Sequence, residues 1–127
     1  TLTLEHTATL FAAIASSPAD ASFPGAYLAA DPEEHQALLD GGQETLRYIF
    51  PQCLAGGQTG LEGHLMRLVL DELAPEAQLK LLADTGQEYF DAWRKAAEGV
   101  LDEHGAEWME TNQPAMWLML QMSQAEP

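Results

Sequence analysis

Apolar residues along the chain recur three and four positions apart, the spacing that brings side chains to one face of an α-helix. One such stripe runs from Leu4 to Phe11, and another runs from Leu61 to Val69. Valine occurs only at positions 69 and 100 and isoleucine only at 14 and 49, so the alternating β-branched segments of a sheet are missing. The pattern predicts an all-α fold, a compact bundle of five to seven helices that forms a single domain over residues 1–127.

Local signals divide this bundle into helices. Asp31-Pro32 is typical of a helix start, because aspartate caps free amides and proline fits the first turn. Thr59 followed by Glu62 predicts a second capped start, and Gly41-Gly42 predicts a break. The expected helices cover about residues 4–16, 31–41, 43–54, 60–73 and 75–104, the last either continuous or hinged near residue 85, with a final helix from about residue 114.

The C-terminal segment departs from the one-sided pattern. Apolar side chains surround the last helix almost completely, so it must be central or shared with a partner. Methionine adapts its shape at promiscuous binding surfaces, but we favour a core position or a homodimer seam for this helix. If it is shared, in a homodimer or with another partner, the seam is formed by Trp108, Met116, Trp117, Met119 and Met122.

The charge balance narrows the classes of function. Twenty acidic side chains face five basic ones, which gives a net charge of −15 at pH 7. Such a chain is repelled by phosphate backbones and anionic membrane surfaces, so we expect no direct nucleic-acid binding and no membrane association. Residues 1–46 hold seven acids and residues 96–127 hold six, and neither range holds a base. The two ends therefore carry most of the negative field.

A group of carboxylates in the second of these ranges has no base beside it. Like charges one helical turn apart destabilise a helix by about 0.2–0.5 kcal/mol per pair, so keeping them suggests a use. We expect this surface to bind a basic protein partner; simple solvation, or adaptation to the environment, is the alternative interpretation. The predicted partner-binding residues are Glu98, Asp102, Glu103, Glu107 and Glu110.

The expected function is that of a small acidic protein-interaction module. An inhibitor, an immunity protein, an anti-defence protein or a nucleic-acid mimic would each place carboxylates on a basic surface in this way. Two alternatives stay open: a small-molecule-binding domain or enzyme with a methionine-rich pocket that includes Trp93, Trp108 and Trp117, and a structural homo-oligomer subunit. The single cysteine excludes an intrachain disulfide, and we expect a cytoplasmic protein.

No motif predicts a reaction, so we expect no enzyme activity, catalytic residue, cofactor or metal site. Cys53 lies in an apolar stretch without the cationic neighbour that stabilises a thiolate. The four histidines lack the paired spacing of zinc or di-iron ligands, and His104 is expected to be a hydrogen-bonded core residue.

The glycine-rich segment at residues 56–63 lacks the lysine of a phosphate loop, so it predicts a turn followed by close helix packing. His64, Arg67 and Asp71 share one polar side of the next predicted helix. These three residues are the remaining candidate for a small binding site.

Overall fold

The structure, a computed structural model, describes residues 2–17, 23–77 and 79–125, and those residues form helices and loops without a strand. The all-α class is confirmed, but the described residues form eight α-helices rather than five to seven. The two additional helices lie between the expected ones, at residues 25–30 and, after α6 ends at His104, at residues 106–112. The elements are α1 (Leu4–Ala15), α2 (Gly25–Ala30), α3 (Pro32–Gly41), α4 (Gln43–Ala55), α5 (Leu61–Leu73), a 3-10 turn η1 (Pro75–Ala77), α6 (Gly86–His104), α7 (Ala106–Asn112) and α8 (Pro114–Ala125).

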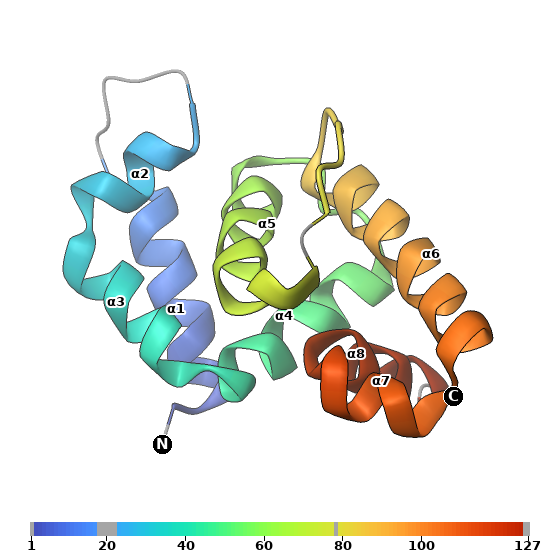
Figure 1. The fold of residues 1–127 in the computed structure, drawn as a ribbon. Coiled ribbons are helices and arrows are strands. Elements are labelled where there is room, and N and C mark those ends of the chain that lie inside the picture. The colour runs from blue at the N-terminus through green and yellow to red at the C-terminus, as the bar shows by residue number, and fades with distance from the viewer. Residues whose placement is uncertain (1, 18–22, 78, 126–127) are drawn as a thin grey trace.

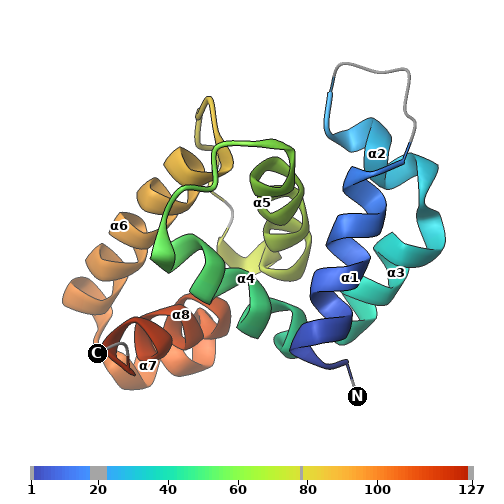
Figure 2. The same ribbon diagram turned by 180° about the vertical axis from the view of Figure 1, so that it is seen from behind.

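The helices are arranged around α4 and α5, which lie in the middle of the molecule (Figures 1 and 2). Helices α1 to α3 pack together on one side, where α1 contacts both α4 and α5. Helices α6 to α8 pack together on the other side, where α6 contacts α5 and α8 contacts α4. None of the helices in the described residues has the length and apolar composition that crossing a membrane requires.

The buried side chains of both sides form one continuous core. Its aromatic centre is Phe50 from α4 with Phe90 and Trp93 from α6, each at most 1% exposed. The ring of Phe50 lies 5.6 Å from that of Trp93 and 6.2 Å from that of Phe90, distances typical of favourable aromatic pairs. This cluster fixes α6 against α4.

Helix α8 is central, as the favoured interpretation of its composition predicts. Met116, Leu118, Met119 and Leu120 are all buried, and α8 contacts α4, α6 and α7. A helix surrounded by other helices needs apolar side chains on nearly every face, which explains the absence of a polar stripe.

Close packing of α5 and α6 depends on two glycines. A Cβ atom on Gly86 would overlap the carbonyl group of Gly63, so neither an alanine nor a larger residue fits there without movement. The backbone amide of Gln87 donates to the carbonyl of Gln58 at 2.9 Å, and its side-chain amide donates to the carbonyl of Cys53 at 3.0 Å. The prediction of a glycine turn with close helix packing is confirmed.

Three local predictions were wrong. Asp31 precedes α3, but its carboxylate accepts a hydrogen bond from the Ser17 hydroxyl instead of capping the helix. Thr59 is exposed, and Gly60 occupies the cap position of α5 without a side-chain bond. Residues 79–84 are not helical, because α6 begins at Gly86 with its own cap: the Thr85 hydroxyl accepts from the Glu88 amide at 3.0 Å.

Candidate functional site

The five predicted partner-binding carboxylates are all exposed, and we call them the acidic surface. Three of them belong to the last two turns of α6 and two belong to α7, which contacts α6. Glu98 and Asp102 lie one turn apart on α6, and Glu107 and Glu110 lie one turn apart on α7. The acidic surface consists of Glu98, Asp102, Glu103, Glu107 and Glu110.

Gly105 creates the corner between these two helices. It ends α6 with a φ of 86°, a backbone conformation that glycine adopts readily and other residues rarely do. Asp102 and Glu103 consequently lie at the carboxyl end of α6, where the helix dipole disfavours negative charge. Their position therefore does not stabilise the helix.

Within the acidic surface, the Nε2 atom of His104 lies 3.9 Å from a carboxylate oxygen of Glu103, a pair that is ionic only when the imidazole is protonated. Among the described residues, no lysine or arginine nitrogen comes within 4.0 Å of a carboxylate oxygen. Arg94 donates instead to the Ser123 hydroxyl of α8 at 2.8 Å, and Lys95, one turn before Glu98, makes no ion pair. The charges of the acidic surface are thus left to solvent or to another molecule.

An aromatic pair lies within this surface. His104 stacks on Trp108 with ring centroids 3.9 Å apart and planes inclined by 18°, and Trp108 is 40% exposed. The prediction that His104 is a core residue was wrong, because the apolar stripe of α6 ends before it. An exposed tryptophan among carboxylates offers a ring face to a lysine or arginine side chain.

The predicted seam residues have different positions. Met116 and Met119 are buried inside the chain's own core, at 2% and 0% exposure, so their side chains do not reach a second molecule. Trp117 and Met122 are partly exposed, and Trp108 is exposed. A seam with a second molecule remains a prediction, and of the five residues only Trp108, Trp117 and Met122 are accessible to form it.

The tryptophans proposed for a ligand pocket are separated. Trp93 is 1% exposed and fills the core between Phe50 and Phe90, whereas Trp108 lies on the surface of α7. The two side chains do not line one pocket.

Two of the three polar residues predicted to share one side of α5, Arg67 and Asp71, contact Tyr89 of α6. The guanidinium carbon of Arg67 lies 4.5 Å from the centre of the Tyr89 ring, and the Tyr89 hydroxyl donates a hydrogen bond to Asp71. Burial raises the pKa of Tyr89, and the hydrogen bond to Asp71 raises it further. His64 lines a hollow of about 370 Å³ beside Phe23, which Arg67 also lines. Arg67 and Asp71 therefore connect α5 with α6.

The remaining chemical candidate is an inert thiol. Cys53 is 5% exposed, and burial, with a smaller contribution from Asp91, raises the pKa of its thiol to about 12. The thiol is therefore neutral at physiological pH, as the prediction of an unreactive cysteine requires. No cluster of three or more histidine, cysteine, aspartate or glutamate side chains suitable for a metal occurs in the part of the chain that the structure describes.

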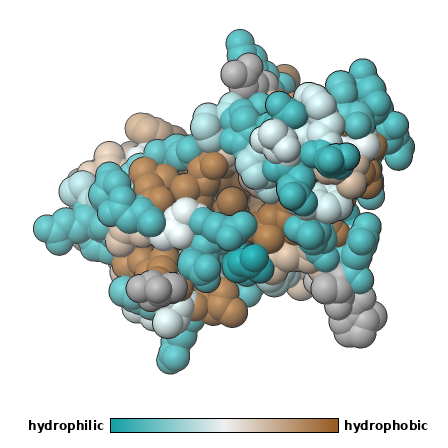
Figure 3. Space-filling model, turned by 60° about the horizontal axis from the view of Figure 1, so that its bottom comes forward, coloured by the Kyte–Doolittle hydropathy of each residue, from teal (hydrophilic) through white to brown (hydrophobic). Residues whose placement is uncertain are grey.

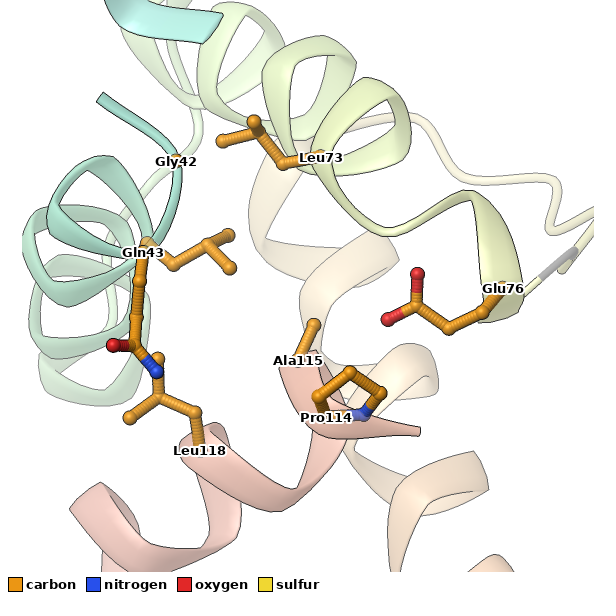
Figure 4. A pocket seen from close by; sticks show the side chains of 8 residues that line it. Gly42, Gln43, Leu73, Glu76, Pro114, Ala115 and Leu118 are labelled. Atoms are coloured by element: carbon orange, nitrogen blue, oxygen red, sulfur yellow. The ribbon is translucent and has the colours of Figure 1, made fainter. Parts of the chain in front are cut away.

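Sequence reasoning missed a hollow of about 220 Å³ between the start of α4, the end of α5 with η1, and the start of α8 (Figure 4). Its lining residues come from three segments far apart in the chain, so no local pattern marks them. We call it the basal hollow, because the starts of α4 and α8, which line it, lie in the lower part of Figure 1. The face of the molecule that Figure 3 brings forward carries several apolar side chains among polar ones. It is lined by Gly42, Gln43, Leu46, Leu73, Glu76, Pro114, Ala115 and Leu118.

Taken together, the fold and these surfaces define an all-α protein with an apolar hollow and with an anionic corner that pairs with no lysine or arginine of the described residues. A scan against protein-family models gave no match, and neither a search of curated proteins nor a search of solved structures gave one.

Proposed function

We propose that this protein is a small acidic interaction module that binds a basic surface on a protein partner through its acidic surface. It acts by binding and without catalysis, as an inhibitor, an immunity protein or a nucleic-acid mimic would. The carboxylates take the place that phosphates or acidic side chains occupy in the basic groove of the partner.

The observation that carries this proposal is the group of exposed carboxylates without an internal cation. A folded protein gains little from carboxylates at the negative end of a helix, and Asp102 and Glu103 lie at that end of α6. The exposed ring of Trp108 adds an apolar contact and a cation–π partner in the same place. Tryptophan is one of the residue types enriched among those that dominate the binding energy of interfaces.

Binding to a synthetic lysine-rich peptide of ten residues tests the proposal, measured by calorimetry at low and at high salt. We expect Glu103→Gln, Glu107→Gln and Glu110→Gln together to weaken binding about tenfold, since three solvent-exposed pairs are lost. The affinity of the wild type should fall as salt rises, because screening weakens exposed charge pairs.

A second triple variant with the same change in net charge is the control. Glu5→Gln, Glu33→Gln and Asp84→Asn remove three exposed carboxylates from separate parts of the molecule. This variant should bind the peptide within twofold of the wild type. Equal weakening by the two variants would mean that only total charge matters, and the acidic surface would not be a site. Binding that does not respond to salt would also refute the proposal.

A further inference from the structure

The basal hollow combines an apolar wall with a single charged group. Leu46, Ala115 and Leu118 are each about 5% exposed, so their side chains form a packed wall that does not depend on a partner. Leu73 closes the hollow from the end of α5 (Figure 4). A ligand with a hydrocarbon part would remove its own apolar surface from water by contact with this wall, which is favourable at about 25 cal/mol per Å².

Glu76 supplies the charge. Figure 4 shows its carboxylate directed into the hollow from the η1 side, opposite Gln43 of α4. It is the one charged residue among those lining the hollow, and no lysine or arginine of the described residues pairs with it. Lys80, four residues further on, lies beyond η1 in a non-helical segment, so it does not form the ion pair with Glu76 that a helix would allow at this spacing.

The backbone at Glu76 is held in place by its neighbours. Gln113 donates from its side-chain nitrogen to the Glu76 carbonyl oxygen at 2.9 Å, which fixes η1 to the start of α8. The amide of Ala77 donates to the carbonyl of Ala74 at 3.1 Å, and Pro75 restricts the preceding backbone. Because this backbone is already fixed, the protein loses little additional conformational entropy when a ligand pairs with the carboxylate.

This arrangement distinguishes between ligand charges. An anion is repelled by Glu76 and by the net charge of −15. A neutral apolar ligand would cover the partly buried carboxylate without giving it a partner, which is unfavourable. A cation on a hydrocarbon chain satisfies both parts of the hollow, because the chain contacts the apolar wall and the charge pairs with Glu76.

We propose that the basal hollow is a binding site for a small alkylammonium compound, whose hydrocarbon chain contacts Leu46, Leu73 and Leu118 and whose ammonium group pairs with Glu76. The volume of about 220 Å³ is smaller than the roughly 300–1,000 Å³ of sites for drug-sized ligands, so the ligand is a short chain. The site shares no residue with the acidic surface, and either proposal can fail while the other holds.

Titration of the full chain with n-pentylamine at pH 7, followed by amide chemical shifts in NMR spectra, tests this site. The amine is protonated at that pH, since primary aliphatic amines titrate near pH 10.4. We expect saturable shifts at Leu46, Leu73 and Leu118. 1-Pentanol should bind about fivefold more weakly, as expected for loss of a partly exposed ion pair, and pentanoate more weakly still.

Two variants separate the roles of charge and space. Glu76→Gln should weaken pentylammonium binding about fivefold without weakening 1-pentanol binding, because the neutral ligand then no longer covers a charge. Glu33→Gln, with the same change in net charge on exposed α3 surface, should affect neither ligand. Gln43→Phe, at an exposed position on the rim, should fill the hollow and weaken both ligands. Equal affinity for the amine and the alcohol, or shifts at other residues only, would overturn the proposal.

Discussion

The two halves of α6 have opposite environments. From Gly86 to Ala97 the helix buries one residue or more in every turn, including Phe90 and Trp93. From Glu98 to His104 no residue is buried, and the polar side chains there are exposed. One continuous helix therefore carries a structural half and a half that is open to other molecules.

The difference shows what each pattern reports. In the first half, apolar residues at helical spacing predict burial correctly, because the aromatic side chains have partners from α4 and α5. In the second half, the same spacing extended to His104 predicts burial wrongly, because the chain turns at Gly105 and the stacked ring of Trp108 covers His104 only in part. Stability and recognition should thus respond to different substitutions along one helix.

Replacing the tryptophan in each region should give the largest contrast. Trp93→Ala removes a fully buried ring from the aromatic centre and should lower the free energy of unfolding by about 3–5 kcal/mol. Trp108→Ala removes a ring that is 40% exposed and should cost less than about 1 kcal/mol. Urea denaturation followed by circular dichroism measures both. Similar losses for the two variants would contradict the division of α6 and α7 into a structural and an open region.

The two glycines of α6 offer a contrast of opposite sign. Gly86→Ala forces a methyl group against the Gly63 carbonyl and should destabilise the protein by about 1–3 kcal/mol. Gly99→Ala meets no atom within 4 Å at an exposed helical position and should stabilise it by about 0.5–1 kcal/mol. Thermal unfolding of the two variants side by side measures the difference. A stabilising Gly86→Ala would mean that α5 and α6 do not approach each other this closely.

The helical class and most helix positions were predictable because they depend on local spacing. The chain breaks at Gly42 and Gly105 with positive φ values. Such breaks are predictable, because glycine adopts positive φ readily and its positions are visible in the sequence. The break before α6 matches one of the two alternatives, a hinge near residue 85, but residues 79–84 were wrongly expected to be helical because Leu79 to Leu82 continue the helical spacing. The cap formed by Thr85 and Glu88 decides the boundary. Leu82 is fully exposed as a result, although its pattern predicts burial.

The site was predictable only in part. Exposure of the acidic surface follows from charge, since unpaired carboxylates are rarely buried. The stacking of His104 on Trp108 depends on the corner at Gly105, and the basal hollow depends on how α4, α5 and α8 meet. Both features arise from tertiary packing, and the sequence of a single helix does not predict how that helix packs against others.

The smallest expected effect concerns the thiol that faces the structural half of α6. The pKa of Cys53 is raised by burial to about 12, against 9.0 for an exposed thiol, so the folded state keeps it protonated after the unfolded state has lost its proton. The resulting stabilisation is complete below pH 9 and is lost as the pH rises from 9 to 12. Between pH 8 and pH 10 the wild type should lose about 1.4 kcal/mol from this group.

Cys53→Ala isolates that contribution, because alanine does not titrate while the buried tyrosines still do. Urea denaturation at pH 8 and pH 10 gives the change in the free energy of unfolding for each protein. The difference between the two changes should be about 1.4 kcal/mol, with the wild type losing more. Identical losses would show that the thiol is exposed to solvent in the folded protein, and the packing of α4 against the buried half of α6 would then be looser than the structure shows.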